Sequence, residues 1–417
     1  KEDMGTIIDF QASDQLAAAV NHILDDELQL SKIHHVNLEK MVKTSWQNVA
    51  IAHVYLFELL IDKKGKMIYS IPPLNLDHIF RMSDERGFVQ FADISTPDLS
   101  SGYALDDNAR ALIAMLHHYR LYETYEDLGL IQKYLDFIGH CMQEDNTFLN
   151  YVDIYGNFTI QNQQENLEDA NGRAVWALGE VVGMANLLPE RIVKLAIELM
   201  ERASKHALVY FSTRSMAFTI KGLIFMKGKN YKAIIQALAD RLAAMFKHES
   251  STDWQWYESY MTYGNSVIPE AMLIAYETTG DCRYRDIACQ SFDFLLSKII
   301  VDNEVHVISN KGWSQRDQPA TKTRGGEQPI DVAYTIIALD RFYKFTRDEQ
   351  YKRNTRIVFE WFLGRNHIRQ IVYNPITGGC FDGLEEHTIN INQGAESTIS
   401  YLMARLKMTD YMNEPVR

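Results

Sequence analysis

The chain contains few cysteines, few prolines and no long apolar segment. Four cysteines and nine prolines occur among 417 residues, and no cysteine pair has C-x-x-C spacing. A disulfide-stapled miniprotein, a collagen-like repeat and an intrinsically disordered chain are therefore excluded. No apolar run approaches the roughly 18 residues that a membrane-spanning helix needs. We expect a soluble, cytoplasmic protein whose cysteines are buried thiols.

Positive charge is also scarce. Lysine and arginine total 42 against 55 aspartate and glutamate residues, so the formal net charge is −13. Because this mean field repels phosphate groups, we expect neither a nucleic acid nor an anionic membrane as a partner. The sequence lacks G-x-S-x-G, P-loop, G-x-G-x-x-G and H-E-x-x-H motifs, which disfavours serine hydrolases, nucleotide enzymes and zinc proteases. We expect no cofactor and no bound metal.

Residues 1–62 form a small segment in which one strand precedes several helices. The pattern predicts a strand over Gly5–Phe10, a helix over Ser13–Leu24 with a serine N-cap, and a helix from Ser45 to about Leu60. The stretches GTIIDF, SDQLAAAVNHILDD and TSWQNVAIAHVYLFELL resemble the C-terminal tail of GT-B fold retaining glycosyltransferases. That resemblance implies an upstream glycosyltransferase domain as a partner, with its nucleotide-sugar pocket and paired glutamates before Lys1.

Residues 63–100 are expected to link this segment to the next domain and to close that domain. Prolines at Pro72, Pro73 and Pro97 are typical of a linker. A short helix is predicted over Leu76–Met82 and a strand over Phe88–Phe91.

From residue 101 onward the sequence repeats one kind of unit. Helices rich in alanine, glycine and apolar residues begin near Tyr103, Asp169, Ser215, Glu258, Gln328 and Gln393. Between them lie helices in which charged and apolar residues alternate with helical period, at Leu128–Gln143, Pro189–His206, Tyr231–Lys247, Arg283–Ile300 and Asp348–Leu363. The first set should be buried and the second should cover it, as the inner and outer layers of a ring. The sixth outer position would be filled by Leu76–Met82 or by an N-terminal helix.

Short inserts interrupt the helices. Turn residues within Phe148–Thr159, after Glu304–Ser309 at Asn310-Lys311-Gly312, and within Ile371–Phe381 predict β-hairpins. We expect these hairpins to line one end of the ring.

Six inner and about six outer helices are the pattern of an (α/α)6 toroid. The segments GYALDDNARAL, ENLEDANGRAVWALG and NPITGGCFDGL resemble those of six-hairpin glycosidase-like domains that follow glycosyltransferase domains in bacteria. The resemblance spans residues 75–408 and implies an activity on carbohydrate. The expected fold class is therefore all-α: an (α/α)6 toroid over residues 101–410 with short β-hairpin inserts, preceded by the small α/β tail segment.

Almost every inner helix opens with carboxylates. They are Asp106 and Asp107, then Glu165, Glu168 and Asp169, then Glu258, then Glu327 and Asp331, then Glu396; only the third helix, at Arg214, has none. One acid in a first turn often just satisfies free N–H groups and complements the helix dipole. Recurrence favours a site, because helices that start at the same end of a ring bring their first turns to one opening. Crowded carboxylates raise one another's pKa values, and this crowding costs stability. A cluster of this kind therefore indicates a functional site.

The chemistry that fits such a funnel is glycosidic bond cleavage, which needs a protonated carboxyl group and an ionised one. Opposite helices would pair Asp107 with Glu258 and Asp169 with Asp331. We predict Glu258 as the proton donor and Asp107 as the base of an inverting reaction, with Asp169 as the rival for either role. Arg110 and Arg173 follow acids by four residues, so they either hold those acids ionised or form structural ion pairs.

Further polar and aromatic residues at the helix starts are predicted to bind the sugar. Aromatic rings provide stacking faces, and Tyr103, Trp254, Trp256, Tyr260 and Trp313 lie at expected helix starts or loops; core packing is the alternative for each. The predicted substrate-binding residues are Asp106, Arg110, Arg173, Trp254, Trp256, Tyr260, Gln328, Asp331 and Glu396.

Two other functions stay open. A non-catalytic toroid would bind a glycan and present it to an attached glycosyltransferase. An isomerase or lyase would need a histidine or tyrosine base, and the helix starts offer Tyr103, Tyr260 and Tyr263 but no histidine. We favour hydrolysis of a manno- or gluco-configured oligosaccharide.

Overall fold

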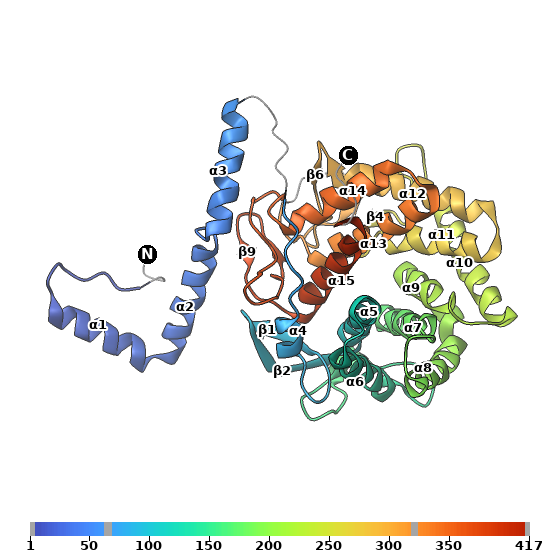
Figure 1. Cartoon of the computed structure of the whole chain (residues 1–417), viewed down its shortest axis with the longest axis horizontal. Helices are drawn as coiled ribbons and strands as arrows, with labels where there is room; N and C mark the ends of the chain where they lie inside the picture. The colour runs from blue at the N-terminus through green and yellow to red at the C-terminus, as the bar shows by residue number, and fades with distance from the viewer. Residues whose placement is uncertain (1–4, 62–68, 318–323, 413–417) are drawn as a thin grey trace.

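Six helices form a closed inner ring in the computed structural model, which describes residues 5–61, 69–317 and 324–412. Each inner helix packs against the next, and the last packs against the first. In ring order they are α5 (Leu105–Tyr122), α7 (Glu168–Gly183), α9 (Thr213–Leu223), α11 (Val267–Thr279), α13 (Pro329–Thr346) and α15 (Ala395–Met412). Figure 1 shows this ring and the N-terminal helices that project from it.

An outer helix covers each inner helix. Five of them follow their inner partners in the chain: α6 (Tyr125–Cys141), α8 (Glu190–Ala203), α10 (Lys229–Glu249), α12 (Cys282–Ile299) and α14 (Glu349–Phe359). The sixth is the short α4 (Asp77–Met82), which packs against α15. The predicted alternation of inner and outer helices is confirmed, and α4 completes the outer layer.

Small residues let two inner helices approach closely. A Cβ added to Gly179 of α7 would lie 2.2 Å from the carbonyl oxygen of Gly222, and one added to Gly222 of α9 would lie 2.2 Å from that of Val175. The α7 and α9 backbones are therefore in direct contact, and a larger side chain would separate them.

The strands are short and belong to the loops between helices. Strands β1 (Val89–Asp93), β2 (Thr96–Ala104) and β3 (Tyr151–Val152) form one antiparallel sheet, and the others pair as β4 (Tyr260–Met261) with β7 (Ser314–Gln315), β5 (Ile300–Val301) with β6 (Glu304–Val305), and β8 (Gly383–Leu384) with β9 (Ile389–Asn390). The hairpin predicted within Ile371–Phe381 is present, since Tyr373 pairs with Cys380. The hairpin containing Glu304 turns earlier than predicted, at Asp302 and Asn303, which both have positive φ.

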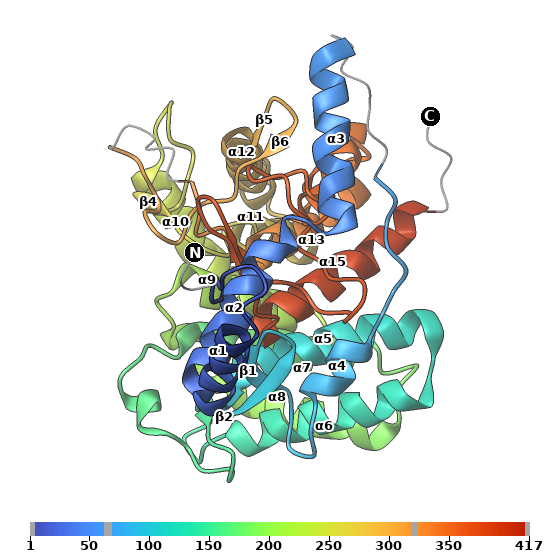
Figure 2. The ribbon, with the colours of Figure 1, turned by 90° about the vertical axis from the view of Figure 1, so that its left-hand side faces the viewer.

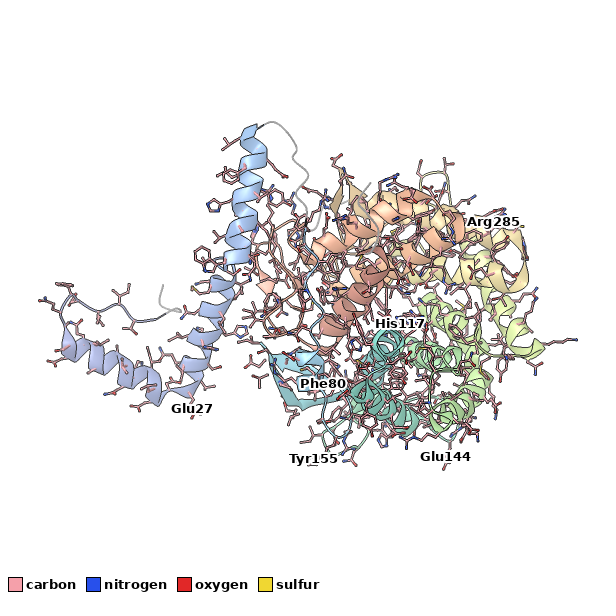
Figure 3. The ribbon with its side chains drawn as sticks, in the orientation of Figure 1. Glu27, Phe80, His117, Glu144, Tyr155 and Arg285 are labelled. Atoms are coloured by element: carbon pink, nitrogen blue, oxygen red, sulfur yellow. The ribbon has the colours of Figure 1, made fainter. Side chains whose placement is uncertain are left out.

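The N-terminal segment is helical and projects from the ring. It comprises α1 (Ser13–Asp25), α2 (Glu27–Val42) and α3 (Trp46–Ile61), and Figure 2 shows α1 and α2 in front of the toroid. Neither α1 nor α2 has a buried residue. Figure 3 shows Glu27 away from the toroid, in which His117 of α5 is buried. The strand predicted at Gly5–Phe10 does not form, and Ala12 rather than a serine occupies the N-cap.

Contacts at the α2–α3 junction attach this segment to the ring. The Nζ of Lys43 donates to the backbone oxygen of His387 at 2.7 Å, and Asn48 Oδ1 accepts from the backbone N–H of Ile371 at 2.8 Å. The guanidinium of Arg369 lies 4.0 Å from the ring centre of Tyr55. The boundary predicted between residues 62 and 63 lies outside the described residues.

Among the described helices, none combines the length and apolar character required to cross a bilayer. Only Cys141 and Cys380 are buried, whereas Cys282 is exposed and Cys289 is partly exposed. The expectation of four buried thiols therefore holds for half of them.

Candidate active site

A pocket of about 320 Å³ lies where α5 and α15 begin. Its remaining walls come from β1, from Tyr151 of β3, from the loop before α13 and from the β8–β9 hairpin. Six carboxylate residues line it: Asp106, Asp107, Glu327, Asp382, Glu385 and Glu396. Gln328, the N-cap residue of α13, lines it as well. Four predicted site residues thus meet at this pocket: Asp106, Asp107, Gln328 and Glu396.

Arg110 organises the carboxylates of the pocket. Its Nη1 donates to Asp107 at 2.6 Å, while its Nη2 donates to Asp106 at 3.1 Å and to Glu396 at 2.9 Å. The Arg110 side chain is only 1% exposed. The predicted contact between Arg110 and Asp106, one helical turn apart, is present. The guanidinium also joins α5 to α15, which the spacing alone does not indicate.

The neighbouring acids of α5 have opposite pKa shifts. Burial acts to raise the pKa of Asp106, but Arg110 and Arg173 outweigh it and lower that pKa. Burial and the adjacent Asp106 raise the pKa of Asp107 well above its usual value. The pair is therefore inclined to carry one proton and one negative charge rather than two charges.

Asp382 provides a second carboxyl group with a raised pKa. Burial raises the pKa of Asp382 to about 7, although the backbone N–H of Gly394 donates to it at 2.8 Å and opposes this shift. The side chain precedes β8 and is partly exposed. We did not predict this residue from the sequence. The sequence signal that could have identified it is its position in NPITGGCFDGL, one of the segments that resemble six-hairpin glycosidase-like domains.

Two side chains behind the pocket wall, Trp361 and His367, contact the carboxylate of Glu327. Its Oε2 accepts from the indole N–H of Trp361 at 2.9 Å, and its Oε1 lies 2.8 Å from Nδ1 of His367. Burial acts to lower the pKa of His367, but Glu327 outweighs it and raises that pKa. A backbone bridge between Glu327 and Leu384 connects this carboxylate to the hairpin that carries Asp382.

Glu258 lies outside this pocket, in the segment before α11. Both of its oxygens accept from Nη1 of Arg214, at 3.0 and 2.8 Å, and Oε1 also accepts from Thr213 at 2.9 Å. The Glu258 side chain is 10% exposed. Residues 258–266 are not helical as predicted, because Tyr260 and Met261 pair with β7 and Gly264 has a φ of 58°.

Asp169 also lies outside the pocket and has different partners from those expected. It accepts from the hydroxyl groups of Ser212 and Tyr263. Arg173 does not pair with Asp169; its Nη1 donates to Asp106 on the neighbouring helix at 3.1 Å. Arg173 also lies over the ring of Phe218, at 4.9 Å from its centre. The predicted pairing along α7 is therefore replaced by one between the neighbouring helices α7 and α5.

Asp331 is partly buried against the same segment. The backbone N–H of Gly264 donates to it at 2.6 Å, yet burial raises the pKa of Asp331 to about 7. The helix starts thus do meet at one end, since Arg173 bonds to Asp106, Arg110 to Glu396 and Gly264 to Asp331. The acids nevertheless divide between the pocket and a closed network.

The predicted stacking residues separate into two groups. Trp254 is 5% exposed and Trp256 is fully buried, and Trp254 donates its indole N–H to the backbone oxygen of Glu258 at 2.7 Å. These two tryptophans therefore belong to the core and offer no face to a sugar. Tyr103 is buried in β2, where its hydroxyl group bonds to Asp84. Tyr260 and Trp313 are exposed and stack on each other.

In residues 5–61, 69–317 and 324–412, no three His, Cys, Asp or Glu side chains are grouped to hold a metal ion. Three of the six carboxylates of the pocket, Asp106, Asp107 and Glu396, are instead paired with Arg110.

Comparison with known proteins gives matches in structure but not in sequence. No protein-family model matches the chain, and no curated protein matches it. A cellobiose 2-epimerase from Bacillus thermoamylovorans is similar with a TM-score of 0.60 at 13% identity, over 80% of this chain and 96% of that one. A D-mannose isomerase gives 0.59 at 12% identity, over 81% of this chain and 96% of that one.

A third similar structure is an alpha-1,6-mannanase from Salegentibacter sp., with a TM-score of 0.54 at 10% identity, over 80% of this chain and 96% of that one. These proteins have different activities, so at such identities the likeness shows the fold alone. The chain adopts the (α/α)6 toroid fold.

Proposed function

We propose that this protein is a carbohydrate-active enzyme of the glycoside hydrolase type, which cleaves an oligosaccharide with two carboxyl groups and no cofactor. The observation that carries the proposal is the pocket at the common end of the helices, where carboxyl groups with opposite protonation tendencies face one cavity. Glycosidic bond cleavage needs that contrast, because one group gives a proton while the other activates water or attacks carbon. The three similar structures are named as a sugar epimerase, a sugar isomerase and a mannanase, which supports an activity on carbohydrate, and only the mannanase is a hydrolase.

We assign the proton donor to Asp382 and the ionised group to the Asp106–Asp107 pair. A pKa of about 7 keeps Asp382 about half protonated at neutral pH, and its partial exposure lets it reach a ligand. The pair on α5 keeps a negative charge, because Arg110 and Arg173 stabilise Asp106. The base function therefore belongs to the Asp106–Asp107 pair, with the charge on Asp106 rather than on Asp107 as predicted. The proposed donor is no longer Glu258, whose two oxygens are already occupied by Arg214.

The test measures release of reducing sugar from cello-oligosaccharides and alpha-1,6-manno-oligosaccharides. Asp382→Asn should lower the rate by about 10²–10⁴-fold, the usual contribution of a general acid, and Asp107→Asn should lower it as well. Above pH 7 the rate should fall about ten-fold per unit as Asp382 loses its proton.

Two variants control this experiment. Asp136→Asn changes an exposed carboxylate of α6 and should leave the rate unchanged. Glu258→Gln tests the alternative donor: a larger loss here than in Asp382→Asn would return that role to Glu258. Full activity in both Asp382→Asn and Asp107→Asn would reject the site. An inverting outcome, which needs carboxyl groups about 6.5–9.5 Å apart, is tested by NMR of the first sugar anomer released.

Glycan binding without catalysis is the second candidate, and the bonds of Arg110 to three carboxylates favour it, because such a network can be purely structural. Oligosaccharide binding without turnover at any pH would support it. An isomerase is less well supported, since no histidine lines the pocket in the described part of the chain and His367 lies behind Glu327.

A glycosyltransferase domain is the partner that we propose for the N-terminal helices. The support is the resemblance of GTIIDF and the two helical stretches after it, together with the apolar side chains that this segment exposes, such as Phe10 at 92% and Leu28 at 86%. Sequencing of the transcript is the test. A start codon immediately before the codon for Lys1 would contradict the proposal.

A further inference from the structure

Two large aromatic side chains stack on each other in solvent at the β4–β7 ribbon. Tyr260 belongs to β4, and Trp313 immediately precedes β7. Their ring centres are 5.8 Å apart with an angle of 25° between the planes, and the residues are 38% and 50% exposed. Exposed single apolar residues are common, but a stacked pair held by strand pairing gives a broad, fixed apolar face.

The loop that carries Trp313 begins at the pocket wall. Asn310 and Gly326 both line the pocket, and the backbone N–H of Asn310 donates to the oxygen of Gly326 at 3.0 Å. The backbone N–H of Trp313 donates to Ser309 at 3.2 Å, which closes this turn. The aromatic pair is therefore fixed three residues along the chain from a wall of the pocket.

The other ring of the pair lies toward the closed network. Glu258 is two residues before Tyr260, and the charge of Glu258 raises the pKa of Tyr260. The pair thus extends from the edge of the pocket toward the half of the opening that contains Glu258 and Arg214.

Trp313 has an unusual backbone conformation. Its φ is 27°, in a region that bulky side chains rarely adopt. Such conformations cost free energy and are concentrated where a residue positions a ligand. Here the conformation accompanies a side chain directed to solvent rather than to the core.

We propose that Tyr260 and Trp313 form a stacking platform for the pyranose rings of an oligosaccharide that extends out of the pocket. The inference rests on the proposed function, which places the sugar to be cleaved in the pocket. The ligand is a neutral oligosaccharide longer than a disaccharide: the apolar faces of pyranose rings fit flat aromatic surfaces, and the net charge of −13 disfavours an anionic chain.

The experiment measures affinity by calorimetry in the Asp382→Asn protein, which removes turnover. The probes are cello-oligosaccharides and alpha-1,6-manno-oligosaccharides from disaccharide to hexasaccharide. Affinity should rise with chain length. Adding Trp313→Ala should reduce the gain of hexasaccharide over disaccharide by about three- to ten-fold, the range expected for loss of one aromatic contact. Trp313→Phe should restore most of that gain, and an unchanged melting temperature would show that the fold is intact.

The matched control is Tyr125→Ala, an aromatic residue of α6 that is 85% exposed, and it should leave the gain unchanged. Equal chain-length dependence with and without Trp313→Ala would overturn the platform, as would an affinity that does not depend on chain length. If either result were obtained while the unsubstituted protein hydrolyses the oligosaccharides, the platform would be rejected and the proposed function would stand. Chain-length-dependent binding that is lost in Trp313→Ala, with no hydrolysis by the unsubstituted protein, would reject the catalytic proposal alone.

Discussion

The two halves of the ring opening contain the same kinds of residue but differ in packing. On the pocket side, formed by α5, α15 and the loop before α13, Arg110 bonds to three acids that face a cavity. On the closed side, formed by α7, α9 and residues 258–266, Arg214 is paired with Glu258, and Asp169 is bonded to two hydroxyl groups. Close packing of α7 and α9 near their starts helps to explain the difference, since a Cβ added to Gly172 would lie 2.8 Å from the carbonyl oxygen of Ser215.

This comparison shows that an acid at a helix start is not evidence of a reactive site by itself. A carboxylate with a dedicated partner in a tightly packed region contributes to stability. A carboxylate beside a cavity, with more acids than cations around it, keeps the capacity to exchange a proton.

The largest effect on stability is expected from Arg214→Met on the closed side. The substitution leaves Glu258 buried without its cation, since the two side chains are 6% and 10% exposed. Removing one partner of a buried ion pair costs about 3–5 kcal/mol. Urea unfolding monitored by circular dichroism measures the change. A loss under about 1 kcal/mol would mean that the closed side is not held by this pair.

Gly179→Ala should have the next largest effect. The added methyl group would meet the backbone of Gly222 at 2.2 Å, so α7 and α9 must separate. Overpacking of this kind costs about 1–3 kcal/mol. The matched control is Gly129→Ala on α6, where a Cβ meets nothing within 4 Å, and where alanine should slightly stabilise the helix. Equal stability of the two variants in thermal unfolding would contradict the close contact.

The pH profiles of stability and of rate together should distinguish Asp331 from Asp382. Burial raises the pKa of each to about 7, from an ordinary value of 3.8. Each therefore stabilises the folded state fully below pH 4, and this contribution is lost as the pH rises toward 7, by up to about 1.4 kcal/mol per unit. Asp331→Asn should flatten the profile of unfolding free energy between pH 4 and 7. Because Asp331 does not line the pocket, only Asp382→Asn should remove the pH dependence of the rate.

The smallest effect is expected from Lys311→Met on the pocket side. Lys311 pairs with Glu385 at the rim, but the two side chains are 55% and 40% exposed. Exposed pairs contribute about 0–1 kcal/mol, so the free energy of unfolding should hardly change. A loss as large as that of Arg214→Met would remove the distinction between the two sides.

Helical periodicity predicted the layers of the fold because buried helices and the helices that cover them differ in amino-acid composition. Helices such as α7 are buried on nearly all faces and are rich in alanine and glycine, whereas α8 alternates charged and apolar residues. Boundaries were predicted less well where strand pairing competes with helix formation, as at Tyr260, or where a glycine adopts positive φ, as at Gly264.

The candidate site was only partly predictable. Asp106, Asp107 and Glu396 were identified because they recur at helix starts, which the ring brings together. Asp382 was not, because it lies in a hairpin with no periodic signal. Trp254 and Trp256 were misassigned, because a tryptophan before a helix can face either the core or solvent, and local sequence does not distinguish the two.

The sequence by itself determined a ring of paired helices with acids at one end, because helical period and burial are local properties that repeat along the chain. Only the tertiary structure decided which acids share a cavity, and which cation each one meets. Arg173 is the clearest example: four residues separate it from Asp169 along α7, yet it bonds to Asp106 on α5. Partners on neighbouring helices depend on helix rotation and separation, and these are set by the packing of all the side chains between them.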